Sequence, residues 1–149
     1  MASVGTVASD VVFRALNTAH RLVLDLSRGR LGWSAAGMPV VELTTTGRRS
    51  GRQRTTMLTS PYSEDEMIVL VASRGGDDRH PDWYLNLCAE PAVEVSVRGG
   101  PRRPMRAETA GAAERDRLWP LITSRHPNYG GYQRKTDRVI PLVLLRPVG

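Results

Sequence analysis

The chain has 149 residues, 40% of them hydrophobic, which is enough for one domain with a buried core and too much for a disordered chain. Its formal net charge of +6 comes from arginine, because Lys135 is the only lysine among 21 basic residues, and this charge favours anionic partners. Cys88 is the only cysteine, which excludes an internal disulfide, and the three scattered histidines offer no zinc-ligand spacing.

The same inventory sets two further expectations. Cys88 has no partner for catalysis, so we expect a small buried residue. No apolar run approaches the ~20 residues of a membrane span, and the first residues lack the basic start and apolar core of a signal peptide. We therefore expect a cytoplasmic protein with a single domain over residues 1–149.

The first predicted element is a helix at about residues 9–28. Ser9 could cap it, Gly29 ends it, and apolar residues recur at three- and four-residue steps between them: Val12, Leu16, Ala19, Val23 and Leu26. Two interpretations remain open. The helix is either docked on the body of the fold, or it is a basic amphipathic helix that touches the inner face of a membrane.

Strand signals dominate the rest of the chain. The pattern predicts a linker at 32–39, a strand at 40–46, a turn at 47–51, a returning strand at 53–60, a turn at 61–66 and an apolar strand at 67–72. Beyond these it predicts a loop at 75–79, a helix from Pro81 to just before Pro91, an alternating strand around 93–97, a hairpin turn at Gly99-Gly100 and a strand at 103–109. The chain then ends with a helix at 112–125, an irregular aromatic loop at 126–132 and a strand at 139–145.

These elements indicate a fold class. The helix at 112–125 is expected to turn Leu118, Trp119, Leu121 and Ile122 inward, although Pro120 perturbs it. About six strands, mostly joined as hairpins, outnumber three helices, and the alternation of a parallel α/β sheet is missing. The sequence therefore predicts an α+β fold built on an antiparallel barrel with peripheral helices.

The stretch TTTGRRSGRQRTT places four arginines and no carboxylate at the tip of the first hairpin. It does not have the spacing of a P-loop, but arginine forks and turn N–H groups form an anion cradle. The alternative is a solvated turn whose arginines bind nothing, although a turn of that kind more often mixes charges of both signs. A nucleic-acid site is disfavoured, because no aromatic residue between positions 44 and 59 could stack on a base.

Two other segments could contribute to a site. In SRGGDDRHPDWYLNL, a strand ends in two glycines before a helix begins, where backbone can approach an anionic ligand closely. Asp77 and Asp78 are expected to cap the turn, Trp83 is expected in the core, and the Asn86 amide could hold a ring carbonyl or a phosphate. In HPNYGGY, two tyrosines form a mobile segment that could close over a planar ligand.

No catalytic triad, carboxylate pair or nucleophile elbow is found, so hydrolysis lacks its parts, whereas a cofactor could carry the chemistry. TTTGRRSGRQR, VASRGGDDRHPDWYLNLCAEPAVEV, the loop at 129–132 and TDRVIPLVLL, in this order, resemble the deazaflavin (F420)-dependent nitroreductase family of actinobacteria. The resemblance runs from about residue 29 to residue 147. It implies a split β-barrel and an oxidoreductase that uses reduced coenzyme F420 to pass a hydride to a quinone, an enone or a nitroaromatic acceptor.

The resemblance also implies roles for residues. Arg49, Ser50 and Gly51 match the positions that hold the anionic arm of the coenzyme. The ring and phosphate side match Thr55, Thr56, Met57, Leu58, Ala72, Ser73, Arg74, Trp83, Tyr84 and Asn86, and the wall on the acceptor side matches Tyr129 and Tyr132. The pattern departs from the family at Met57, where proline is expected, at Arg74, where lysine is common, and at Ser60 and His126, which are often aromatic.

From this resemblance we hypothesise that Ser73 stabilises charge on the acceptor oxygen and that Tyr129 or Tyr132 clamps the acceptor or relays a proton. An FMN-binding split barrel and a non-catalytic F420 carrier are the rival interpretations, since FMN also needs a phosphate cradle. Further expectations are a homodimer and, through residues 9–28, peripheral contact with a membrane.

Overall fold

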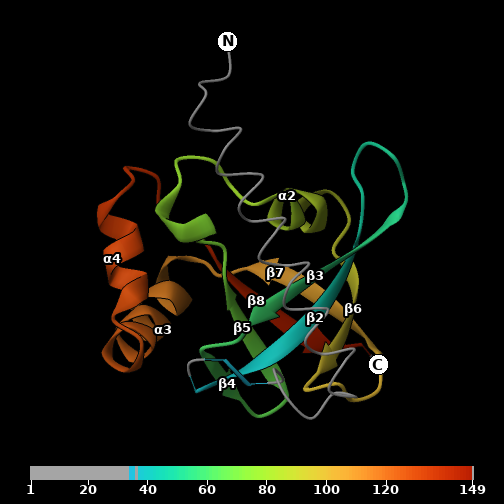
Figure 1. The fold of residues 1–149 in the computed structure, drawn as a ribbon, viewed down its shortest axis with the longest axis horizontal. Helices are drawn as coiled ribbons and strands as arrows, with labels where there is room; N and C mark the ends of the chain where they lie inside the picture. Colours follow the sequence, from blue (N-terminus) through green and yellow to red (C-terminus); the bar gives the residue numbers. More distant parts are fainter. Residues whose placement is uncertain (1–33, 36, 149) are drawn as a thin grey trace.

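The computed structural model describes residues 34–35 and 37–148, and within them eight strands form one curled antiparallel sheet (Figure 1). The strand order is β1-β2-β6-β7-β8-β5-β4, and β3 pairs with β2 outside this path. The strands are β1 (Ser34–Ala35), β2 (Met38–Thr46), β3 (Gln53–Thr59), β4 (Tyr62–Glu64), β5 (Met67–Val71), β6 (Ala92–Val97), β7 (Arg103–Thr109) and β8 (Leu142–Pro147). The predicted α+β antiparallel architecture is confirmed, with β1 and β4 as short strands that the sequence pattern did not indicate.

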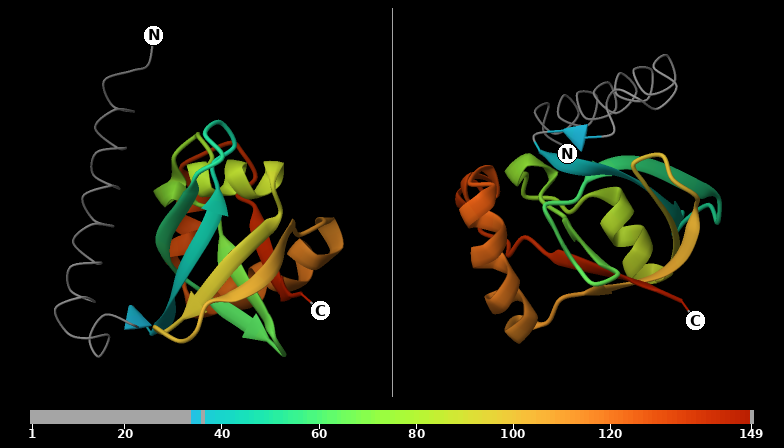
Figure 2. Two further views of the ribbon diagram at one scale, coloured as in Figure 1. Left: turned by 90° about the vertical axis from the view of Figure 1, so that its right-hand side faces the viewer. Right: turned by 90° about the horizontal axis from the view of Figure 1, so that it is seen from below.

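Helices lie against both faces of the curled sheet (Figure 2). They are a 3-10 turn η1 (Arg74–Gly76), α2 (Asp82–Ala89), α3 (Ala112–Arg125) and α4 (Asn128–Arg134). None of these described helices has the length and apolar character needed to traverse a bilayer. The helix predicted at 9–28, together with its proposed membrane contact, lies outside the described residues.

Two apolar clusters lie on opposite faces of the sheet, because alternate side chains of a strand point to opposite sides. On the inner face, Leu70 of β5 belongs to a cluster that includes Trp83 and Leu87 of α2. On the outer face, Val69 belongs to a cluster that includes Leu118 of α3, together with residues of α4. The continuous apolar run of β5 therefore reflects burial on both faces, with α2 on one side and α3 and α4 on the other.

Three local predictions are wrong. Helix α4 begins at Asn128, inside the segment predicted as an irregular loop at 126–132. Leu121, predicted to face inward on α3, has 40% of its surface exposed, because the helical period that buries Leu118 and Ile122 turns it to solvent. Cys88, predicted to be buried, is exposed on α2 beside the buried Leu87.

The hairpin between β6 and β7 turns one residue earlier than predicted. Arg98 and Gly99 both have positive φ, 51° and 74°, and the amide of Gly100 donates to the carbonyl of Val97 at 2.9 Å. Positive φ at both central residues is the geometry whose twist matches the flanking strands. The turn therefore centres on Arg98-Gly99, with Gly100 as its fourth residue.

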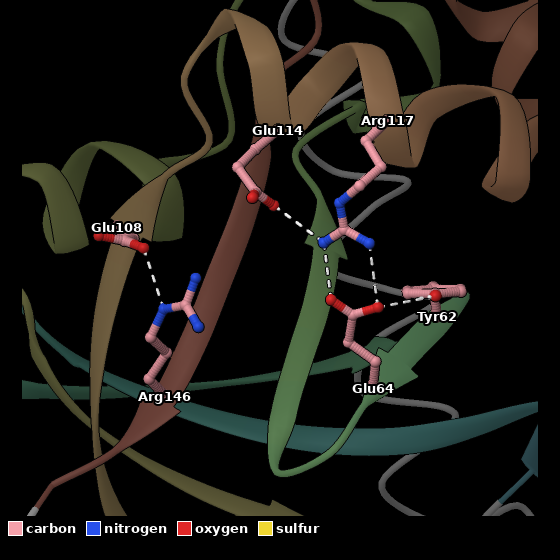
Figure 3. A network of polar contacts seen from close by, with 6 residues as sticks. All are labelled: Tyr62, Glu64, Glu108, Glu114, Arg117 and Arg146. Carbon is pink, nitrogen blue, oxygen red and sulfur yellow. Dashed lines mark hydrogen bonds and ion pairs between the residues drawn. The ribbon is translucent and has the colours of Figure 1, made fainter.

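Ion pairs tie α3 and β8 to neighbouring strands (Figure 3). Arg117 of α3 binds Glu64 of β4 at 2.6 Å and Glu114, one turn earlier, at 3.0 Å. The hydrogen bond from Arg117 is the main reason that the pKa of Glu64 lies below its usual value. Arg146 of β8 pairs with Glu108 of β7 at 3.0 Å. Arg117 and Arg146 therefore each have a carboxylate partner.

Candidate active site

Residues 47–52, which we call the arginine turn, join β2 to β3 and project beyond the sheet next to α2 (Figure 1). The amide of Gly47 donates to the carbonyl of Arg52, and that of Gly51 to the carbonyl of Gly47, both at 2.8 Å. Gly51 has a φ of 71°, and a Cβ on Gly47 would lie 2.6 Å from Oγ of Ser50. Both glycines are therefore required by the tightness of the turn.

Arg48 anchors the arginine turn to α2. Its Nη1 and its main-chain amide donate to Oδ1 of Asn86 at 2.8 and 3.2 Å, and its Nη2 lies 3.4 Å from Oδ1 of Asp82. The other end of the Asn86 amide donates to Oγ1 of Thr45 at 3.3 Å. Asn86 is buried with both ends of its amide engaged, so it holds the turn in place. Sequence reasoning counted Arg48 among the four arginines of the anion cradle and singled out Asn86, but it missed the bond between them, because nothing local joins residues 38 positions apart.

The other three arginines of this hairpin differ from those in Figure 3. Arg49, Arg52 and Arg54 are exposed, and no carboxylate among the described residues pairs with any of them. By contrast, Arg117 and Arg146 each hold an acid. Guanidinium groups that stay close together without an acid favour an anion, and the fork geometry suits carboxylates and phosphates.

Strand β3 sends its predicted contact residues to both faces of the sheet. Thr56 lies opposite Leu43, and Leu58 packs against the inner apolar cluster. Thr55 and Met57 occupy the alternate positions, and Oγ1 of Thr55 lies 2.9 Å from Oγ1 of Thr44. A ligand on one face of β3 would meet the side chains of only half of the predicted residues at 55–58.

Residues 72–80, which we call the Ser73 segment, connect β5 to α2. Ala72 is fully buried, and its amide donates to the carbonyl of Pro141 at 3.0 Å. Ser73 is also buried, but its hydroxyl makes no hydrogen bond with any residue that the structure describes. Arg74 is held within the segment by Asp77 at 2.8 Å, with only 10% of its side chain exposed. The hydroxyl of Ser73 is therefore available to a ligand, whereas Arg74 is already engaged.

The capping role predicted for the two aspartates is confirmed in part. Oδ1 of Asp77 accepts from the amide of Arg79 at 2.8 Å, which is a turn-capping bond. Asp78 has a longer-range partner, since its Oδ1 accepts from the hydroxyl of Thr136 at 2.8 Å. One aspartate thus shapes the segment, and the other ties it to the chain beyond α4.

The tyrosines of α4 are packed, which contradicts the prediction of a mobile loop. Tyr129 is buried, its hydroxyl donates to Sδ of Met38 at 3.5 Å, and its ring meets that of Tyr132 edge-on at 6.0 Å. A Cβ on Gly76 would lie 2.7 Å from the carbonyl oxygen of Tyr132, so η1 packs directly on α4. Burial raises the pKa of Tyr129, which keeps its hydroxyl protonated and able to donate.

On α2, the predicted aromatic residues belong to the core. Trp83 and Tyr84 are both buried in the inner cluster, and the hydroxyl of Tyr84 lies 3.0 Å from Oγ1 of Thr109. Burial raises the pKa of Tyr84, which stays neutral. The ring of His80 lies 5.0 Å from that of Tyr84. Helix α2 is therefore contacted by the arginine turn at Asn86 and by the Ser73 segment at Tyr84.

This arrangement can bind and orient a ligand. It offers exposed guanidinium groups on one side of α2, and an uncommitted serine hydroxyl on the segment that leads into α2. The phenols of Tyr84 and Tyr129 stay neutral because they are buried, but their hydroxyls are already engaged by Thr109 and Met38. Such a set can hold an anionic group and donate hydrogen bonds to an oxygen that gains negative charge.

Comparisons with known proteins agree with one another. The family model described as F420H(2)-dependent quinone reductase matches residues 18–147. The F420H(2)-dependent quinone reductase Rv1261c of Mycobacterium tuberculosis (strain H37Rv) is 39% identical over 132 residues, which are 85% of this chain and 86% of that protein. A solved F420-H2 dependent reductase (FDR-A) is 39% identical with a TM-score of 0.64, covering 72% of this chain and 94% of its own. A chain described as a domain-swapped dimer is 35% identical with a TM-score of 0.67, covering 87% and 96%.

Proposed function

The chain belongs to the F420H(2)-dependent quinone reductase family, and from this membership we propose that it binds reduced coenzyme F420 and uses it to reduce a quinone. The coenzyme, when bound, supplies the hydride. The observation that carries the proposal is the arginine turn, anchored on α2 by Arg48 and otherwise free of acids among the described residues. An anionic phosphate and polyglutamate arm needs a cationic surface of this kind.

We assign the arm to Arg49, with the backbone N–H groups of Ser50 and Gly51 as further donors. The ring would lie against one face of β3, where it meets either Thr55 and Met57 or Thr56 and Leu58. The buried Ala72, Trp83 and Tyr84 would support the ring side from the core. Two assignments made from the family resemblance are refined. Asn86 acts through Arg48, because both ends of its amide are occupied, and Arg74 shapes the Ser73 segment through its ion pair with Asp77.

On the acceptor side, we propose that the Ser73 hydroxyl donates to the quinone oxygen on which negative charge develops. Its lack of a partner among the described residues supports this role, since a hydroxyl committed elsewhere could not donate. Tyr132 is partly exposed and could contact the acceptor, whereas the buried Tyr129 supports Tyr132 through their edge-on contact. Enones and nitroaromatics are further proposed acceptors, because they also gain charge on oxygen.

A turnover assay tests the proposal. The protein is mixed with reduced F420 and, in turn, a quinone, an enone and a nitroaromatic, and coenzyme reoxidation is followed by absorbance. We expect saturable turnover with the quinone. Binding of F420 without turnover on any acceptor would indicate a carrier, and a purified protein with flavin absorbance that binds FMN but not F420 would indicate the FMN alternative.

The role of Ser73 has a separate test. Ser73→Ala is expected to lower kcat at saturating reduced F420 by about tenfold to a hundredfold. This is at or slightly below the usual cost of losing one hydrogen-bond donor that stabilises developing charge. Ser63→Ala, at an exposed position on β4, is the matched control and should leave kcat unchanged. Equal kcat for wild type and Ser73→Ala would remove the proposed role and leave coenzyme binding intact.

The family also supports the expectation of a homodimer, because a relative 35% identical to this chain is described as a domain-swapped dimer. We propose that this chain dimerises as well. Light scattering during size exclusion should give twice the chain mass of 16.4 kDa. A monomer at assay concentration would contradict the dimer without affecting the proposed activity.

A further inference from the structure

Arg138 lies in the link between α4 and β8, and its guanidinium is directed at the Ser73 segment. Nη1 donates to the carbonyl of Ala72 at 3.2 Å, Nη2 to that of Ser73 at 2.8 Å, and Nε to that of Asp77 at 2.8 Å. Nη1 also lies 3.2 Å from Nδ1 of His80. All three nitrogens of one side chain therefore bind a single segment, from its first residues to its last.

These bonds determine the tautomer of His80. A guanidinium group donates hydrogen bonds and accepts none, so Nδ1 of His80 is the acceptor and a neutral ring carries its proton on Nε2. Protonation of Nδ1 would bring its hydrogen against a cation. Burial, followed by the charge of Arg138, lowers the pKa of His80. The ring of His80 also packs at a tilt against the neutral phenol of Tyr84 from α2.

The backbone between the carbonyls that Arg138 binds contains one strained residue, Arg74. Arg74, Gly75 and Gly76 follow one another with φ values of 46°, 65° and 86°. Left-handed conformations persist where surrounding contacts fix them, especially at a residue other than glycine. Ser73 comes immediately before this run, and its side chain makes no anchoring bond of its own among the described residues. The position of its hydroxyl therefore depends on the backbone that Arg138 binds.

We propose that Arg138 is a positioning residue for quinone reduction, which holds the Ser73 hydroxyl in its donating position and keeps His80 in the Nε2–H form. The link to catalysis rests on the proposed function. Arg138 acts through the segment that it binds and touches neither coenzyme nor acceptor. Lysine cannot replace it, because one ammonium on a flexible stem cannot reach four acceptors that the planar fork reaches together.

Kinetic measurements test the positioning role with two variants and one control. Arg138→Lys keeps the charge, and Arg138→Met keeps much of the side-chain length. For both we expect kcat at saturating reduced F420 to fall by about tenfold or more, since a small displacement of a reacting group costs up to about a hundredfold. The Kd for F420 should change by less than about threefold, because the arginine turn is untouched. Arg146→Met removes an exposed arginine paired with Glu108 and should behave as wild type.

Nitrogen NMR of the histidines gives a readout that needs neither coenzyme nor turnover. In the wild type, His80 should show an unprotonated Nδ1 and a protonated Nε2. In Arg138→Met the constraint is gone, and the pKa of His80 should rise toward its ordinary value. A Nδ1–H tautomer of His80 in the wild type would overturn the proposal. This test uses the wild type alone, so it remains decisive if both Arg138 variants fail to fold.

The two kinds of failure can be told apart. A wild type without turnover on any quinone contradicts the proposed function, and the tautomer of His80 then still tests the contact with Arg138. If the wild type reduces a quinone and Arg138→Lys has the same kcat, the positioning role is contradicted. The proposed function then still stands.

Discussion

The arginine turn and the Ser73 segment both contact helix α2, the turn at Asp82 and Asn86 and the segment through His80 at Tyr84, but they are held in different ways. The turn is tied to α2 through Arg48, and three of its neighbouring arginines extend into solvent. The Ser73 segment is bound on several sides, by Pro141, by Thr136 and by Arg138. A region that attracts charge can remain exposed and adaptable, whereas a region that must place one hydroxyl has to be fixed. Under the proposed function, this contrast assigns binding to the arginine turn and positioning to the Ser73 segment.

The largest difference between the two regions should appear on adding one methyl group to each. Gly76→Ala would place a Cβ 2.7 Å from the carbonyl oxygen of Tyr132 at a φ of 86°, and Gly51→Ala would meet nothing within 4 Å at a φ of 71°. Both lose about 1–2 kcal/mol because of the left-handed backbone. Gly76→Ala should lose about 1–3 kcal/mol more because of overpacking. Urea unfolding of both variants measures this, and equal losses would contradict the tight packing of the Ser73 segment on α4.

A second comparison concerns the anchor of the arginine turn. Asn86→Ala removes a buried amide that binds Arg48 and Thr45, and should lower the free energy of unfolding by about 1–3 kcal/mol. It should also weaken F420 binding, because the turn loses its support on α2. Asp82→Asn is the matched control, since the carboxylate is 70% exposed and its pair with Arg48 should be worth less than about 1 kcal/mol. Normal F420 affinity in Asn86→Ala would show that the anchor does not organise the anion site.

The smallest effect is the pH dependence that His80 contributes. Its pKa is lowered in the folded protein, so the unfolded chain binds the proton first as the pH falls. The stability that His80 contributes is therefore present above the ordinary value of 6.5 and is lost as the pH falls from there toward the lowered folded value. His80→Gln should reduce the loss of unfolding free energy on acidification across this range. Identical pH dependence in wild type and variant would contradict the neutral His80 held by Arg138.

The comparison also shows which features local sequence can reveal. The antiparallel strands were predicted because apolar alternation and hairpin glycines are local signals. The helix at 112–125 and the strand at 103–109 were placed with the bounds that the structure gives. The arginine turn was identified as a cationic cluster for the same reason, since all its residues are neighbours in the chain.

The features that the sequence did not reveal depend on distant contacts. Helix α4 contains Gly130 and Gly131, which disfavour a helix, and it is stabilised by the burial of Tyr129 and by η1 packing on its end. Arg48 and Arg138 each bind residues far away in the sequence, so no local pattern reveals these contacts. The turn at Arg98-Gly99 was placed one residue too late because the glycine pair outweighed the arginine that adopts a positive φ.

The central claim is that the arginine turn holds the anionic arm of F420, and calorimetric titration of the coenzyme tests it most directly. The wild type should show saturable binding that weakens with added salt, and Arg49→Glu should raise the Kd by about tenfold or more, the equivalent of one charged hydrogen bond. Arg103→Glu, at an exposed position on β7, changes the net charge equally and should bind nearly as wild type. Absence of saturable binding by the wild type, or an equal loss in the two variants, would contradict the account.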